Sequence, residues 1–172
     1  EKLTNVILNY CLMQHRAGAD IIMLFDTWGG LLGENQFKEF SLKYMKQIVQ
    51  GLHDKYPELP IILFTKGGGN CISEIAKTGC NVVGLDWTVN IANAIKNIGH
   101  LCSLQGNLDP SVLLGDKEHI EKETKSIIEK FTSNGFKTGH IFNLGHGISQ
   151  FTPPENVECL VEAVKKYSSK AV

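Results

Sequence analysis

Five short apolar runs constrain the fold of this chain more than any other feature of its sequence. As a group the runs are rich in β-branched residues, and each is four or five residues long and shows no polar alternation. The runs are Ile21–Phe25, Ile61–Phe64, Asn81–Leu85, Leu101–Leu104 and Ile141–Leu144. Such runs are typical of strands that are buried on both faces of a parallel sheet. The sequence therefore predicts five buried, parallel strands.

Helical patterns separate these runs. Apolar residues recur every three or four positions from Phe37 to Leu52 and from Ile120 to Phe131, which predicts an amphipathic helix over each stretch. The opening segment carries Leu3, Val6, Ile7 and Tyr10 on one helical face, and Gly18 is a plausible end for that helix.

The segment Thr152-Pro153-Pro154-Glu155 predicts the start of the last helix. Thr152 is expected to cap it, Pro154 fits its first turn, and Glu155 can complete a capping box. Val157, Leu160, Val161 and Val164 are then expected to form the buried stripe.

Strands that alternate with helices imply right-handed βαβ units in the α/β class. Two architectures fit this order, an open doubly wound sheet and part of a (β/α)8 TIM barrel. The predicted strand ends are spaced by 39, 21, 20 and 39 residues, or about 30 per unit, the repeat of a barrel of roughly 250 residues. We therefore expect residues 1–172 to supply roughly the last five βα units of a single barrel domain, whose N-terminal part lies outside this sequence.

Composition excludes several other classes of protein. Apolar residues make up 42% of the 172 positions, and the 17 basic residues nearly balance the 18 acidic ones, for a net charge of −1. This balance argues against a nucleic-acid binder, which needs a basic surface. No apolar run approaches the roughly 20 residues of a membrane-spanning helix. The five cysteines are odd in number and form no C-x-x-C pair, so we expect reduced packing residues.

Polar residues and glycines follow every predicted strand. The strings run from Asp26 to Gly30, Thr65 to Asn70, Asp86 to Thr88, Gln105 to Asp109 and Asn143 to Gly147. The carboxyl ends of parallel strands meet at one rim, where α/β proteins place their chemistry. Five polar strand ends therefore predict a pocket and favour an enzyme.

Individual residues of these strings have more than one interpretation. Gly67–Gly69 could cradle a phosphate, but they match neither the dinucleotide fingerprint nor the Walker pattern, so a tight turn is favoured. Lys66 could form a Schiff base or an ion pair at the rim. Asp26 and Asp86 could be catalytic carboxylates or helix caps, and the sequence leaves both readings open.

His146 is the strongest single candidate for a functional residue. Glycines flank it on both sides, so the backbone can approach closely and the ring stays accessible. The other histidines lack this setting and are expected at the surface or in packing; they are His15, His53, His100, His119 and His140. No histidine pair has the spacing of a metal site.

Taken together, the strand-end strings resemble the uroporphyrinogen decarboxylase family. The matching strings, in the family's order, begin at Leu24 (LFDTWGG), Phe64 (FTKG), Val83 (VGLDWT), Leu104 (LQGNLDP) and Asn143 (NLGHGI). The resemblance covers nearly the whole chain. It implies a (β/α)8 barrel, a homodimer, and a lyase of porphyrin (haem) biosynthesis that decarboxylates the four acetate arms of uroporphyrinogen III without metal or organic cofactor.

The resemblance also assigns residues. It implies that Thr27 and His146 bind substrate carboxylates and that Phe25 lines the cleft, while the family's acid and arginines belong to the absent N-terminal half. The 172-residue piece alone is therefore expected to be inactive. No nucleic acid or membrane partner is implied, and the location is the cytoplasm or a plastid-type organelle.

Two alternatives stay open beside this interpretation. The chain could be a non-catalytic binding or structural fragment of the enzyme. A related branch transfers methyl groups from cobamides to thiols with zinc, but its His-x-Cys-Gly string is replaced here by Phe64-Thr65-Lys66-Gly67. A soft-thiol zinc site cannot be built from these residues, so the decarboxylase is preferred.

Overall fold

A computed structural model describes residues 1–136 and 138–168 of the chain. Helices and strands alternate along both of its compact units, Glu1–Gly84 and Leu85–Val172. The strands follow chain order and pair in parallel within each unit, as the sequence predicts. The prediction of one domain over residues 1–172 stays a prediction. No helix of the described ranges is both long and apolar enough to cross a membrane.

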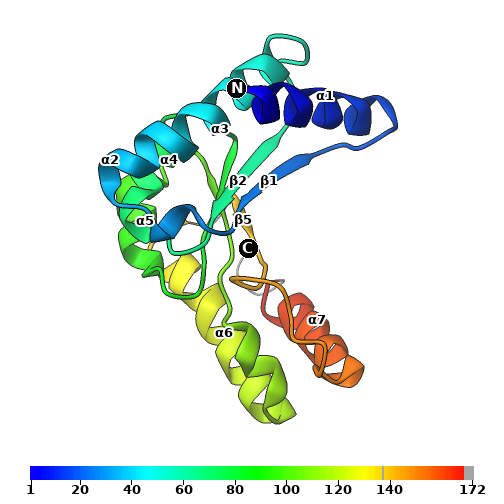
Figure 1. Ribbon diagram of the computed structural model, residues 1–172. Coiled ribbons are helices and arrows are strands. Elements are labelled where there is room, and N and C mark those ends of the chain that lie inside the picture. Colours follow the sequence, from blue (N-terminus) through cyan, green and yellow to red (C-terminus); the bar gives the residue numbers. More distant parts are fainter. Residues whose placement is uncertain (137, 169–172) are drawn as a thin grey trace. The chain divides into compact units, whose positions relative to one another are not determined.

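The first unit contains three strands and the helices that cover them (Figure 1). Its elements are α1 (Lys2–Arg16), β1 (Ile22–Asp26), η1 (Gly29–Leu31), α2 (Glu34–Phe37), η2 (Lys38–Leu42), α3 (Lys43–His53), β2 (Ile61–Thr65), η3 (Gly69–Cys71), α4 (Ile72–Ala76) and β3 (Val82–Gly84). The pairing aligns Phe25 with Phe64 and Phe64 with Gly84. The predicted helix from Phe37 is interrupted by the π-helical turn η2, which the apolar spacing did not indicate.

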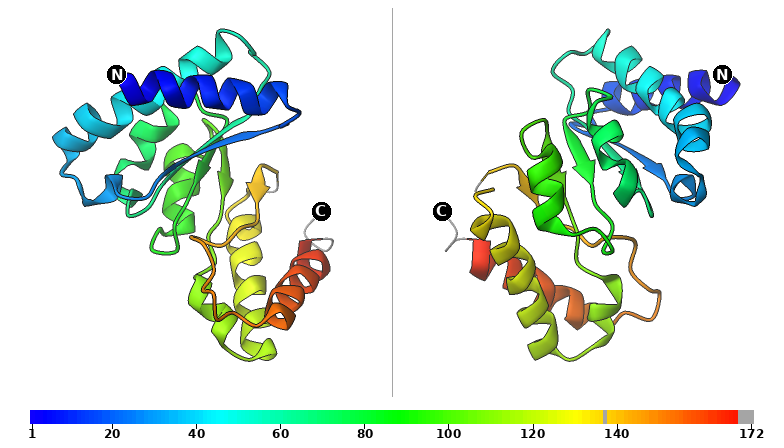
Figure 2. Two further views of the ribbon diagram at one scale, coloured as in Figure 1. Left: turned by 45° about the vertical axis from the view of Figure 1, so that its right-hand side comes forward. Right: turned by 90° about the vertical axis from the view of Figure 1, so that its left-hand side faces the viewer.

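Strand β2 and helix α3 supply much of the core of this unit. All five residues of β2 are buried, and α3 buries Met45, Ile48, Val49 and Leu52 on one face. Helix α1 packs against α3 (Figure 2), and Gly51 permits this contact because a Cβ there would come within 2.7 Å of Leu8.

The expected apolar face of α1 is not buried. Leu3, Val6 and Tyr10 are 75%, 64% and 59% exposed, and the helix buries Thr4, Cys11 and Leu12 instead. Leu3 and Tyr10 line a groove of about 800 Å³ that also borders Met23 and Phe25 of β1. The apolar stripe is real, but it faces this open groove rather than the core of the unit.

In the described part of the second unit, strands β4 and β5 alternate with the α-helices α5, α6 and α7 (Figure 2). Its elements are α5 (Ile91–Ile98), β4 (Ser103–Gln105), η4 (Pro110–Leu114), α6 (Lys117–Ser133), β5 (His140–Ile141) and α7 (Pro154–Ser168). Asn90 and Asp116 cap α5 and α6 by accepting hydrogen bonds from backbone N–H groups. These caps explain why the two helices begin where they do.

Both strands of this unit differ from the predicted runs. The strand predicted over Leu101–Leu104 begins only at Ser103, because Leu101 belongs to the turn that ends α5. The strand predicted over Ile141–Leu144 is reduced to His140–Ile141, and an isolated parallel bridge joins Leu144 to Leu108. An apolar run thus locates these strands, but the positions of their hydrogen bonds set the ends.

Helices α6 and α7 lie side by side and run in the same direction. At one end, the Asn156 amide donates to the carbonyls of Leu113 and Gly115. Near the end of α7, Lys166 and the Tyr167 hydroxyl donate to Glu121 of α6. These contacts fix which face of α7 is turned inward.

The predicted apolar stripe of α7 is therefore only partly right. Leu160 is buried and Val157 and Val164 are half-buried, but Val161 is 46% exposed. Asn156 and Ala163 take the remaining buried positions. The predicted cap is wrong, because the Thr152 hydroxyl is buried without a hydrogen-bond partner.

Candidate active site

Asp26 anchors the loop that follows β1. Its Oδ1 accepts a hydrogen bond from the Gly29 amide at 2.9 Å, and its Oδ2 accepts from the Ser41 hydroxyl at 2.6 Å and the Thr65 hydroxyl at 3.4 Å. The two oxygens of one carboxylate thus join the loop after β1 to the turn η2 and to the end of β2. Asp26 organises this loop, but it does not occupy a helix N-cap position, because the N-cap residues of η1 and α2 are Trp28 and Gly33.

Thr27 is the first residue after this anchor and is half-buried. The loop that carries it is held close to the loop after β2, since a Cβ on Gly30 would lie 2.1 Å from the Lys66 carbonyl oxygen. Two backbone segments can pack this tightly only where a glycine lacks a side chain. Thr27 is thereby fixed at the carboxyl end of β1.

Phe25, the neighbour of Asp26 in β1, presents its ring to solvent. It is 70% exposed, and its ring lies edge-to-face against Phe64 with centroids 6.2 Å apart. The structure thus brings Phe25 and Thr27 together at one rim of the first unit. An exposed aromatic ring beside a hydroxyl is suited to a ligand that has both an apolar ring system and polar substituents.

The glycines after β2 form a turn. Gly67 has a positive φ of 70°, and Gly68 is packed against the Thr65 side chain. The α-helix that follows, α4, has only five residues, so it offers a weak dipole for a phosphate. The favoured interpretation of a tight turn agrees with this geometry.

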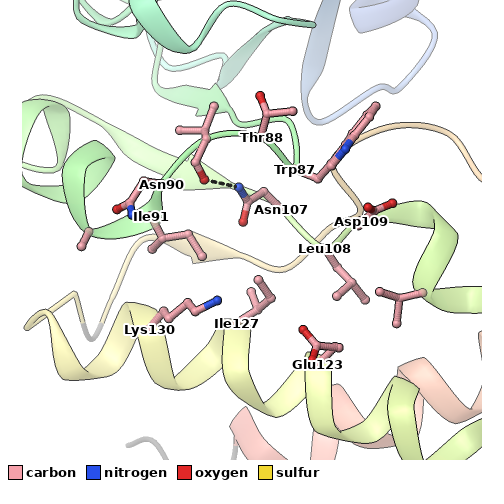
Figure 3. Close-up of a pocket in the computed structure, with 13 residues that line it drawn as sticks. Trp87, Thr88, Asn90, Ile91, Asn107, Leu108, Asp109, Glu123, Ile127 and Lys130 are labelled. Atoms are coloured by element: carbon pink, nitrogen blue, oxygen red, sulfur yellow. Dashed lines mark hydrogen bonds between the residues drawn. The ribbon is translucent and has the colours of Figure 1, made fainter.

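In the second unit, Asp86 also organises a loop rather than standing open to solvent. It is 2% exposed, and its Oδ1 accepts from the Thr88 amide at 2.8 Å and the Thr88 hydroxyl at 2.5 Å. From the end of β4, the Asn107 amide donates to the carbonyls of Asp86 at 2.8 Å and Val89 at 2.9 Å. Figure 3 shows the second of these bonds as a dashed line.

His146 lies at the end of the segment that follows β5. The Gly145 amide donates to the Leu108 carbonyl at 2.7 Å, which ties this segment to the residues after β4. The half-buried His146 ring stands edge-to-face against Trp87, with ring centroids 6.3 Å apart and an interplanar angle of 81°. The structure therefore places His146 at the rim of the second unit, at the wall formed by Trp87.

His140 has a packing role, as the sequence predicts. Its ring stacks on Phe131 with centroids 3.5 Å apart, and Nε2 lies 2.8 Å from the Gly106 carbonyl oxygen. A carbonyl only accepts, so Nε2 carries the proton and donates. Burial lowers the pKa of His140, partly offset by this hydrogen bond, so its neutral form is favoured.

A cavity of about 450 Å³ lies beside Trp87, between the loops after β3 and β4 and one face of α6 (Figure 3). Its polar lining includes Thr88, Asn90 and Asp109 from the loops and Glu123 and Lys130 from α6. The aspartate already accepts hydrogen bonds from the amide and the hydroxyl of Ser111.

The cysteines are free in the structure. Burial raises the pKa of the Cys11 and Cys80 thiols. Both residues are buried in the core of the first unit, where a thiol is unreactive. Within residues 1–136 and 138–168, no three histidine, cysteine or acidic side chains gather closely enough to hold a metal ion.

Three residues that organise the rims were not singled out by sequence reasoning. Asn107 and Trp87 belong to the polar strand-end strings, so their positions were indicated but their roles were not. Ser41 gave no signal at all, because it reaches Asp26 only through the π-helical turn η2. Such turns are frequent at functional sites but have no simple sequence signature.

The alternating strands and helices, with polar residues at the strand ends, show that the chain is part of a (β/α)8 barrel. It is similar in structure to a methyltransferase from Methanosarcina mazei, with a TM-score of 0.81 over 95% of this chain and 47% of that one. The sequence identity is 23%, so this likeness shows the fold alone.

The family model for uroporphyrinogen decarboxylase (URO-D) matches residues 1–167, and the chain belongs to this family. It is 49% identical to uroporphyrinogen decarboxylases of Legionella pneumophila (strain Corby) and Actinobacillus pleuropneumoniae serotype 5b, over 97% and 99% of its own length. These matches cover 47% and 48% of the two relatives. The chain thus spans about half the length of the curated relatives it matches.

Proposed function

We propose that the full-length protein to which this chain belongs is a uroporphyrinogen decarboxylase. It would remove the four acetate carboxyl groups of uroporphyrinogen III and give coproporphyrinogen III. The family match over residues 1–167 carries this proposal. The half-coverage of the relatives supports a further proposal, that residues 1–172 form the C-terminal part of the enzyme.

The chemistry needs a place for the electrons that remain when CO2 leaves. Protonation of the adjacent pyrrole ring makes that ring the electron sink, so no cofactor has to supply one. The protein must then hold the macrocycle and stabilise its many carboxylates with hydrogen-bond donors and cations. In this proposal, the acid and most cations come from the part of the enzyme outside this chain.

Three residues of this chain are assigned to the substrate. The Thr27 hydroxyl donates to one substrate carboxylate, and the His146 imidazole binds another through a ring N–H. The exposed ring of Phe25 lines the cleft beside Thr27 and contacts the porphyrinogen skeleton. The fixed backbone of the Asp26–Gly30 loop supports this role, because a rigid support keeps a hydrogen-bond donor in place before substrate arrives.

The surroundings of β1 support the idea of an incomplete barrel. The strand pairs with β2 on one side, and the groove of about 800 Å³ and the exposed apolar residues of α1 lie beside it. We propose that the preceding strand and helix of the full-length enzyme cover this region. The complete enzyme is further proposed to form a homodimer and to work in the cytoplasm or in a plastid-type organelle.

The test is an assay of porphyrin products with the purified full-length protein. We expect conversion of uroporphyrinogen III to coproporphyrinogen III, and we expect Thr27→Ala and His146→Asn each to reduce turnover at least about tenfold, the size of a lost charge-assisted hydrogen bond. The exposed residues Thr138 and His100 provide the matched controls, Thr138→Ala and His100→Asn. A full-length protein that consumes no uroporphyrinogen would overturn the proposal.

A further inference from the structure

We propose that Trp87 is a positioning residue that holds the His146 imidazole in the orientation required to bind a substrate carboxylate. The inference rests on the proposed function for its consequence in catalysis, but the ring contact that carries it is a feature of the structure itself. Trp87 is one of two tryptophans in the chain.

The backbone that carries Trp87 is fixed on both sides. Before it, the Asp86 carbonyl accepts a hydrogen bond from the Asn107 side chain, and after it, Thr88 is held by the Asp86 carboxylate. Val89 is held by a second bond from Asn107. A side chain whose flanking residues are this well anchored can serve as a stable wall for its neighbour.

The backbone that carries His146 is brought against this wall by a glycine. A Cβ on Gly145 would lie 2.3 Å from the Trp87 backbone nitrogen, so any other residue would push the two segments apart. On the far side of His146, a Cβ on Gly147 would meet nothing within 4 Å. The close approach at Gly145 thus brings the two segments together, and the rings of Trp87 and His146 meet there.

The ring geometry suits this role. An edge-to-face arrangement at 6.3 Å and 81° is the favourable geometry for two aromatic rings. Trp87 is 36% exposed and also lines the cavity of Figure 3, so it borders open space as well as His146. A wall on one side of the imidazole limits its rotamers and lowers the entropy lost when it binds a carboxylate.

The first experiment is a double-mutant cycle in the full-length protein, with Trp87→Leu, His146→Asn and the pair combined. If Trp87 acts through His146, Trp87→Leu raises the KM for uroporphyrinogen about two- to tenfold, the range of an aromatic pair contact, with a smaller change in kcat. The same substitution adds nothing in the His146→Asn background. Trp87→Phe keeps a ring at this position and stays within about twofold of the wild type.

The second experiment does not depend on activity. The full-length protein is labelled with 5-fluorotryptophan, and the fluorine resonances of Trp87 and Trp28 are assigned by Trp87→Phe and Trp28→Phe. His146→Asn is expected to shift the resonance of Trp87, whose ring contacts His146, by more than that of Trp28.

The outcomes separate the two proposals. A protein that shows the fluorine shift but has no decarboxylase activity refutes the proposed function and leaves the ring contact standing. An active enzyme in which the Trp87 resonance ignores His146→Asn, or in which the two substitutions have additive effects on KM, overturns the positioning role.

Discussion

Strands β1 and β2 have nearly the same sequence, Ile-Met-Leu-Phe-Asp and Ile-Ile-Leu-Phe-Thr, and pair residue by residue. Their burial nevertheless differs. Every residue of β2 is buried, whereas Phe25 of β1 is 70% exposed and its partner Phe64 only 5%. Strands of similar sequence thus differ in burial, because an apolar run indicates the environment for which a strand is suited and not the one that it has in this chain.

The sequence of β1 is therefore that of a strand with more buried surface than β1 has in this chain. A run without polar alternation is typical of a strand covered on both faces, and β1 lacks such cover while β2 has it. An exposed apolar edge of this kind promotes association with other chains. The proposed remainder of the barrel explains the mismatch, because it would complete the surroundings of β1.

The largest expected effect is a difference in stability between variants of the paired residues Phe64 and Phe25. Phe64→Ala in the full-length protein should lower the free energy of unfolding by about 3 to 5 kcal/mol, because it opens a cavity in a packed core. Phe25 is assigned to the substrate cleft, where substrate and not a packed core borders its ring, so Phe25→Ala should cost less than about 1 kcal/mol but should raise the KM for substrate. Urea unfolding and steady-state kinetics measure the two effects. Equal losses of stability would remove the distinction between the strands.

The next largest expected effect is a loss of stability when Asp26, the last residue of β1, loses one of its hydrogen-bond donors. Ser41→Ala should destabilise the full-length protein by about 1 to 2 kcal/mol, because it removes a short hydrogen bond to the Asp26 carboxylate. The exposed Ser133, which makes a long bond of 3.5 Å to the Lys130 carbonyl, provides the matched control, Ser133→Ala. Thermal unfolding of both variants decides the point, and an unshifted Ser41→Ala would contradict an anchoring role for Asp26.

Association of the isolated chain tests the edge of β1 directly. The 172-residue chain alone is expected to self-associate, and Met23→Lys should shift it towards smaller species, since a charge on an edge strand opposes pairing. Met13→Lys, at an exposed position of α1 outside the groove, is the control. Sedimentation velocity measures the distribution. A monodisperse wild-type monomer would contradict the expected exposed edge.

The smallest expected effect is a pH dependence of stability that comes from His140 in β5, the strand that pairs with β4. The lowered pKa of His140 means that the unfolded chain binds its proton more readily than the folded one. The stability from neutral His140 is thus complete above about pH 6.5 and is lost as the pH falls through the lowered pKa. Between about pH 7.5 and pH 5.5, the melting temperature of the full-length wild type should fall more than that of His140→Gln. Parallel curves would show that His140 does not titrate on unfolding.

The sequence was sufficient to predict the order of elements and the location of polar strand ends, because burial on both faces leaves unbroken apolar runs. It could not predict that α1 turns Leu3 and Tyr10 towards a groove, since periodicity identifies a face but not its partner. The interactions of Asp26 and Asp86 were also out of reach. Their donors, Ser41 and Asn107 among them, come from segments that only the tertiary structure brings close.

The central claim is that this chain is one part of a barrel whose other part completes the decarboxylase. The most direct test assays porphyrin products with three samples: the full-length protein, the 172-residue chain, and this chain co-expressed with the remainder of the full-length protein. We predict conversion by the first and third samples and none by the second. Conversion by the 172-residue chain alone, or none by the full-length protein, would contradict the account.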